Sequence, residues 1–296
     1  MKRRPWSKSK IILLILAGMI FFPSLTLMMN RAHHETKVGY RWHSLSTGEG
    51  GLMAEENDEK MFSPKMVEDL PPAAKRYLLH TILPGAPLAE RVKLKMSGTL
   101  RREDAQEWIP FEAEEILAGG RGLVWKAKLK TGEDSWLEGA EYYYRGKGQI
   151  MFFHHRFIPS IIESSLVVDR SMAGRVLIES IWLPPVFLPQ RLARWENMDK
   201  LRAKVTLSID DLSSTMTMVV EEDGRLREVV IPRYHQGEGG KIEKAEWRPF
   251  GITVEEEKTF EGYRIPTKVR AGWWHGSSRY TEVFRAEIKE ATFYWS

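Results

Sequence analysis

Histidine and cysteine are the residues most able to bring metal or nucleophilic chemistry to this chain. There is no cysteine, which excludes a thiolate zinc site, a thiol nucleophile and a disulfide framework. None of the eight histidines belongs to an H-E-x-x-H helix or a His-x-His strand pair. His154 and His155 are adjacent, so on a strand they point to opposite faces. We therefore predict no metal site and no cofactor.

Motifs for nucleophilic hydrolysis and phosphate binding are missing from the sequence as well. No G-x-S-x-G elbow is present. The glycine-rich stretch 237–240 lacks the following helix and the Lys-Ser/Thr pair of a P-loop, and it is typical of a hairpin loop. We predict no catalytic residue, and an enzyme with an unrecognised site stays as an alternative.

Clustered carboxylates could supply an acid and a base. Glutamates gather at 112–115 and 255–257, but such charge runs on strands usually form the solvated face. Glu179 follows Arg175 by four residues, a spacing that places both side chains on one face of a helix. We interpret this pair either as a surface ion pair or as a polar group at the mouth of a pocket.

Tryptophan is abundant, with eleven in the chain. Most are expected in the core, but tryptophans also line apolar ligand cavities. We predict a ligand-binding wall that contains Trp125, Phe153 and Trp182, with Arg175 and Glu179 near its rim.

The net charge of +4 has a local origin. Residues 1–10 contain five basic side chains and no acidic one, and the rest of the chain holds 39 basic and 40 acidic residues. Nucleic-acid-binding proteins carry their positive charge on the folded surface. The composition therefore predicts no nucleic-acid partner.

Residues 11–29 read IILLILAGMIFFPSLTLMM and carry no charge. A helix of about 20 residues crosses the hydrocarbon core of a bilayer. The basic residues before this segment place the N-terminus in the cytoplasm and the remainder outside. A cleaved signal peptide is the competing interpretation, but no A-x-A-like site follows. We predict a single-pass anchor in the cell membrane.

These signals divide the chain into three parts. A cytoplasmic tail and transmembrane anchor occupy 1–30, a flexible linker 31–66, and an extracytoplasmic β-rich domain 67–296. The linker is predicted from its glycines, serines and acidic cluster, and from its weak apolar periodicity.

Helices and strands are both predicted in the domain. Apolar spacing predicts helices over 66–83 and, in two pieces, over 158–182. Alternating apolar and charged residues, as in 122–130, predict strands for most of the remainder. Helices grouped beside an antiparallel sheet give the α+β class. We expect a large curved antiparallel sheet, a half-open barrel, with a few helices against its concave face and one transmembrane helix before it.

Several segments, taken in order, resemble a known family. They are Leu70-Pro71-Pro72, Ser97 to Arg101, Trp108 to Phe111, Leu123 to Lys128, Gly174 to Glu179, and Tyr263 to Thr267. Together they resemble a family of uncharacterised prokaryotic membrane-anchored proteins, a domain of unknown function, which implies no reaction. The pattern of elements is also similar to lipoprotein-carrier half-barrels, which implies an apolar cavity closed by helices.

The sequence thus favours a membrane-anchored, non-catalytic module that binds a lipid or other apolar ligand. The alternative is an envelope scaffold with a solid interior that binds a protein partner through an exposed sheet edge. The interior of the sheet distinguishes these interpretations from each other and from an enzyme.

Overall fold

The computed structural model describes residues 8–48, 60–191, 193–235, 237 and 244–295, with side chains from residue 25 onward. In this part of the chain, thirteen strands form one antiparallel sheet. The strands are β1 (Arg91–Leu100), β2 (Ile109–Ala118), β3 (Gly122–Lys130), β4 (Trp136–Tyr144), β5 (Lys147–His154), β6 (Ile158–Glu163), β7 (Arg194–Asn197), β8 (Arg202–Ile209), β9 (Leu212–Val220), β10 (Leu226–His235), β11 (Glu246–Phe260), β12 (Tyr263–Trp273) and β13 (Thr281–Tyr294). The helices are α1 (Lys8–Thr47), α2 (Pro72–Thr81) and α3 (Leu166–Glu179), with 3-10 segments η1 (Pro64–Val67), η2 (Ser180–Trp182), η3 (Pro184–Phe187) and η4 (Pro189–Arg191).

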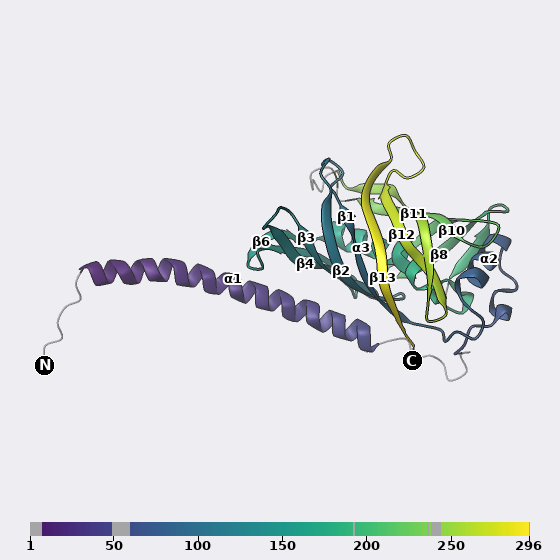
Figure 1. Ribbon diagram of the computed structural model, residues 1–296, viewed down its shortest axis with the longest axis horizontal. Coiled ribbons are helices and arrows are strands. Elements are labelled where there is room, and N and C mark those ends of the chain that lie inside the picture. Colours follow the sequence, from purple (N-terminus) through teal and green to yellow (C-terminus); the bar gives the residue numbers. More distant parts are fainter. Residues whose placement is uncertain (1–7, 49–59, 192, 236, 238–243, 296) are drawn as a thin grey trace.

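Two meanders make up the sheet, and their ends meet in its middle. Strands β1 to β6 run outward to one edge, strands β13 to β7 run outward to the other, and β1 pairs with β13 (Figure 1). A β-bulge interrupts this seam between Lys95 and Met96. A side-chain carbon on Gly98 would lie 2.0 Å from the carbonyl oxygen of Arg285, so the two backbones approach closely there only because residue 98 is glycine.

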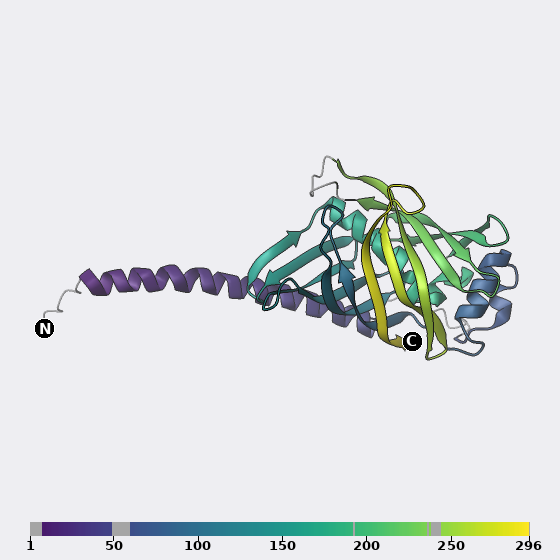
Figure 2. The same ribbon diagram turned by 45° about the horizontal axis from the view of Figure 1, so that its top comes forward.

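Helix α3 lies across the inner face of the sheet and contacts both meanders. It packs against β3, β4 and β5 on one side and against β8, β9 and β10 on the other, which requires the sheet to curl around it (Figure 2). Its inward side chains belong to one continuous hydrophobic core, and α2 packs at the end formed by β7, β8, β9 and β12. The predicted α+β class and curved antiparallel half-barrel are confirmed.

The outer face of the sheet is covered in part by α1. Val38 and Leu45 are buried against Ile116, Val124 and Tyr142, which alternate along their strands with inner-face residues. Residues 31–47, which the sequence assigned to a linker, lie in α1. His34, Val38 and Leu45 recur with helical spacing, and this stripe gives α1 a face that the sheet can bury.

The predicted membrane anchor, residues 11–29, falls largely in the part of α1 whose side chains lie outside the described residues. Among the residues that are described, no helix combines the length and the apolar character needed to cross a bilayer. The division of the chain at residues 30 and 66 stays a prediction.

Residues 158–163, predicted to begin a helix, form the edge strand β6 instead. Three of them, Ile158, Ile161 and Ile162, are β-branched, and such side chains favour strands. The helix begins only after Ser165, whose hydroxyl accepts a hydrogen bond from the backbone N–H of Val168 at 3.2 Å.

We predict that Leu45→Ala loosens α1 from the sheet. Leu45 has no exposed surface, and removing such a side chain costs about 2–5 kcal/mol through lost burial and a residual cavity. Hydrogen exchange of the amides in residues 34–47 should accelerate while exchange in β2 and β3 stays slow. His33→Ala, at an exposed position of the same helix, serves as the control. Unchanged protection in the Leu45 variant would contradict the docking of α1.

Candidate functional site

A cluster of charged side chains lies inside the half-barrel, between α3 and the sheet. Its centre is Arg175 of α3, which is only 8% exposed. The Arg175 Nε donates a hydrogen bond to Glu179 Oε1 at 2.7 Å, one helical turn later. Its Nη1 donates to the carboxylate of Glu141, and its Nη2 lies 3.6 Å from Glu115 Oε2. One guanidinium thus faces three carboxyl groups.

The strand register brings two of these carboxyls together. Glu115 on β2 pairs with Trp125 on β3, and Trp125 pairs with Glu141 on β4. Residues directly opposite each other in a sheet share a face, so the indole ring lies between two carboxyl groups. The guanidinium of Arg175 lies over this ring, 5.1 Å from its centroid. The sheet therefore presents a preformed receptor for one cation.

Burial makes the cluster electrostatically unusual. Glu115 has no exposed surface, and among the described residues neither of its carboxyl oxygens has a hydrogen-bond partner. Burial and, next, the charge of Glu179 raise the pKa of Glu115 well above its usual range. Burial alone would lower the pKa of Arg175, but the neighbouring carboxylates outweigh it and raise that pKa.

A second arginine flanks the cluster on β10. Arg233 Nε donates to the backbone carbonyl of Ser171 at 3.0 Å, and its guanidinium lies over the rings of Phe250 and Trp273 at 4.9 and 5.4 Å. Burial, reinforced by the charge of Arg175, lowers the pKa of Arg233 to about 10. Both flanks of the curled sheet therefore contribute charged groups beneath α3.

The structure brings together three of the five predicted site residues: Trp125, Arg175 and Glu179. Arg175 and Glu179, predicted near the rim of a pocket, are buried between α3 and the sheet, and so is Trp125, predicted in the wall. Trp182 is also buried, and its indole N–H donates to the carbonyl of Pro266 on β12 at 3.0 Å, not to a group of the Arg175 cluster. Whether these residues bind a ligand stays a prediction.

Phe153 lies on the opposite face from the other predicted site residues. It packs under α1, with ring centroids 5.4 Å from His34 and with the guanidinium of Arg31 4.8 Å above it. Its neighbour Phe152 is the residue that points inward, 6.3 Å from Trp125. Adjacent residues on a strand face opposite ways, so the expected wall position was displaced by one residue.

Glu115 and Glu141 were missed as site residues. Glu115 belongs to a run of glutamates that was interpreted as a solvated face. The signal that could have found it is its parity with Phe111 and Ala113, two inner-face residues of the same strand. No comparable local signal marks Glu141.

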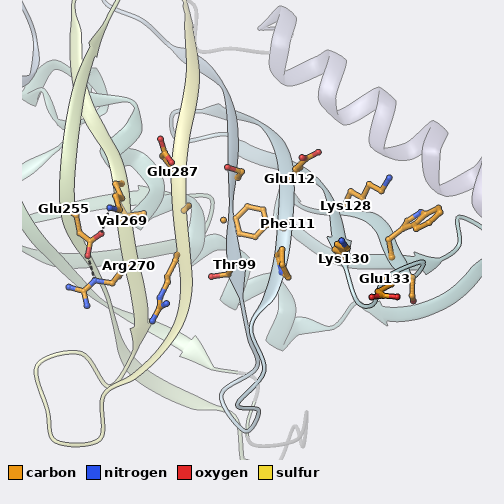
Figure 3. A pocket seen from close by; sticks show the side chains of 18 residues that line it. Thr99, Phe111, Glu112, Lys128, Lys130, Glu133, Glu255, Val269, Arg270 and Glu287 are labelled. Carbon is orange, nitrogen blue, oxygen red and sulfur yellow. Dashed lines mark ion pairs between the residues drawn. The ribbon is translucent and has the colours of Figure 1, made fainter.

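A groove of about 930 Å³ opens on the outer face of the sheet, where β1, β2, β12 and β13 lie side by side (Figure 3). Acidic and basic side chains alternate along it: Glu112, Glu133, Glu255, Glu287, Lys128, Lys130, Lys268, Arg270 and Arg285. Many of these charges neutralise one another, as Glu255 Oε1 and Arg270 Nε do at 2.6 Å. The groove therefore combines paired charges with apolar side chains such as Pro110 and Trp136.

A second groove, of about 790 Å³, runs between α1 and strands β1 to β4. Val38 and Ala140 form part of its floor, and charged side chains such as Arg31 and Lys126 border it. Across the described residues, no set of three histidine, aspartate or glutamate side chains could hold a metal ion. The buried cluster is therefore the strongest candidate for function.

A model of a family of unknown function, DUF6920, matches residues 68–293. The chain belongs to this family. The match agrees with the resemblance found along residues 67–274. Because the function of the DUF6920 family is unknown, membership implies no reaction and no ligand. No curated protein matches the chain in sequence.

Solved structures share the arrangement of the DUF6920 domain only distantly. A LolA superfamily protein from Nitrosomonas europaea is similar with a TM-score of 0.40 and 10% identity, over 76% of this chain and 93% of that one. A putative outer membrane lipoprotein-sorting protein domain from Vibrio parahaemolyticus gives 0.36 and 11%, over 69% and 85%. Likeness at this level does not identify a ligand.

We predict that Glu115→Gln stabilises the chain more in alkali than in acid. Because the pKa of Glu115 is raised in the folded state, the unfolded state binds fewer protons once the pH exceeds the ordinary glutamate value of about 4.3. The wild type therefore loses up to about 1 kcal/mol per pH unit above that value, and the amide does not.

Urea unfolding of both forms at about pH 5 and about pH 8 measures the difference. Glu114→Gln is the matched control, since Glu114 is the next residue on β2 but its side chain is 44% exposed on the outer face. A gain at Glu115 that is the same at both pH values would contradict a raised pKa.

Proposed function

We propose that this chain is a non-catalytic binding module, held at a membrane, that takes a lipid or other apolar ligand against the inner face of its half-barrel. The observation that carries the proposal is the buried charge cluster around Arg175, set in an otherwise apolar wall. Ligand sites typically combine apolar walls with a few converging polar groups.

Stability alone does not explain the cluster. Replacing a buried ion pair by well-packed apolar residues is often neutral or stabilising, so a core selected only for stability has little need of one. Here carboxyl oxygens of Glu115 and Glu179 have no hydrogen-bond partner among the described residues. The indole N–H of Trp125 has none there either. Buried polar groups without partners beneath a covering helix are suited to binding the polar end of an amphiphile.

Access to the inner face requires α3 to move. The sequence suggested an apolar hollow, whereas side chains of α3 and of the segment after it occupy that space, among them Met172, Val176, Leu177 and Phe187. The ligand must therefore displace α3. The helix is held to the sheet partly through Arg175, whose ion pairs an amphiphile's head group can replace.

The membrane anchor is part of the proposal. Residues 11–29 carry no charge, and five basic residues stand before them. This pattern supports an N-terminus in the cytoplasm and a domain on the non-cytoplasmic side of the cell membrane. A tethered domain of this kind can exchange an apolar ligand with the bilayer beside it.

An envelope scaffold is the second candidate. The packed interior favours it, because a scaffold needs no empty volume and binds its protein partner through an outer surface or an edge. In that case the charge cluster fixes the position of α3, and α3 has no reason to move. Immobilising α3 therefore separates the two functions.

We predict that a disulfide between α3 and β10 abolishes ligand uptake. A side-chain carbon at Gly174 would lie 3.7 Å from the Cβ of Arg233, within the range of about 3.5–4.5 Å that disulfides require. The chain has no other cysteine, so Gly174→Cys with Arg233→Cys forms a single reversible lock. The full chain in lipid nanodiscs is then exposed to a photoactivatable fatty acid, and the labelled peptides are identified by mass spectrometry.

In the reduced protein the probe should label inner-face peptides, such as the one around Trp125. In the oxidised protein that labelling should vanish, while labelling of residues 11–29 persists in both states. Gly174→Ser with Arg233→Ser is the matched control and should not respond to reductant. Inner-face labelling that is absent from the reduced protein, or that is equal in both states, would reject the proposal and favour the scaffold.

A further inference from the structure

Four large apolar side chains stand in solvent at one corner of the sheet. Phe157, Ile158, Ile162 and Leu166 are 50%, 55%, 56% and 73% exposed, and they lie in the turn before β6, in β6 itself and at the start of α3. Contiguous apolar surface of this kind usually marks a contact with a partner or a membrane. We call these four residues the β6 patch.

The β6 patch also occupies an edge of the sheet. Strand β6 pairs with β5 on one side and ends the strand order on the other. Soluble proteins usually protect such an edge with charged residues, and the opposite edge follows this rule, since β7 is short and reads Arg-Trp-Glu-Asn. Strand β6 instead reads Ile-Pro-Ser-Ile-Ile-Glu. The two edges therefore face different surroundings.

The path of α1 indicates what those surroundings are. Arg31 Nη1 donates to the carbonyl of Glu138 on β4 at 3.3 Å, and the Arg31 guanidinium lies over Phe153 on β5. From this contact toward its N-terminus, α1 continues without a break to Lys8. Figures 1 and 2 both show it leaving the domain beside β6.

The end of the uncharged segment on α1 determines where the bilayer surface lies relative to the domain. The uncharged segment ends at residue 29, two residues before Arg31. At 1.5 Å per residue, only about 3 Å of helix separates the end of that segment from the β4–β5 contact. A bilayer that encloses residues 11–29 therefore has its head-group layer at the level of β5 and β6. Leu25, Met28 and Met29, at the same level, are exposed as well.

The neighbours of the β6 patch suit a head-group layer. Trp136, at the start of β4, packs edge-on against His155 in the β5–β6 turn at 5.2 Å. Arg156 in the same turn is 64% exposed while its Nε lies 3.1 Å from the carboxylate of Glu138. Tryptophan and arginine are typical of membrane–water interfaces, where one part of the side chain is apolar and the other hydrated.

We propose that the β6 patch inserts into the head-group layer of the same bilayer that holds α1, so that the domain sits with this edge on the lipid surface. This inference rests on the proposed anchor, and it adds the surface of the domain that meets lipid. It also places the first residue of α3, Leu166, at the bilayer.

Single cysteines test the contact, because the chain has none of its own. Ile158→Cys and Ile162→Cys report on the β6 patch. Glu222→Cys is the control, since Glu222 is 71% exposed in the β9–β10 turn near α2, at the end of the domain away from the N-terminus (Figure 1). Each full-chain variant carries a nitroxide label and is reconstituted in vesicles of phosphatidylethanolamine and phosphatidylglycerol.

Relaxation of the label by oxygen and by a water-soluble nickel chelate measures its depth. The labels at 158 and 162 should collide more with oxygen and less with nickel than the label at 222 does. Protection that disappears when the chain is diluted in excess lipid would show contact between copies and overturn the inference. Labels at 158 and 162 that are as open to nickel as the control would also overturn it.

Flotation of the vesicles after an alkaline wash separates this inference from the anchor on which it rests. A chain that stays with the vesicles, but whose β6 labels remain open to nickel, refutes the docked edge and leaves the anchor intact. A chain that the wash removes refutes both. Circular dichroism of each labelled variant, compared with the wild type, checks that the domain is folded.

Discussion

A guanidinium that is buried between a helix and a sheet has to be neutralised by groups already in place, and this requirement determines how the half-barrel closes. Arg175 meets Glu115 from β2, Glu141 from β4 and Glu179 from its own helix. Helix α3 is therefore held at a definite height and rotation over the sheet, and the apolar side chains beside Arg175 pack in the register that results.

The two faces of the sheet serve different purposes. The inner face joins both meanders beneath α3 in one apolar core with a charged centre. The outer face is mixed in charge along its open groove, and it is apolar where α1 lies on it. Because side chains alternate along every strand, successive residues of β2, β3 and β4 point to the inner and the outer face in turn, and the same strands supply both environments. The helix that leads toward the predicted anchor is thus packed on the outer face of the strands whose inner face carries the Arg175 cluster.

Local chemistry predicted what local sequence controls. The spacing of Arg175 and Glu179 correctly placed them on one helix face. Burial that depends on distant parts of the chain could not be predicted. Glu115 is buried because α3, which begins about fifty residues later, covers it. Phe153 was placed on the inner face but lies on the outer one, because a shift of one position along a strand reverses the face. In α1, a polar and glycine-containing composition concealed a stripe of buried residues.

The first and last strands of the domain pair with each other and join the two meanders in the middle of the sheet. The seam between β1 and β13 contains a bulge and the close backbone contact at Gly98. The two meanders extend from this seam to either side, and α3 bridges them across the inner face. Because α3 contacts both meanders by packing and not by strand pairing, its release would break no hydrogen bond of the sheet.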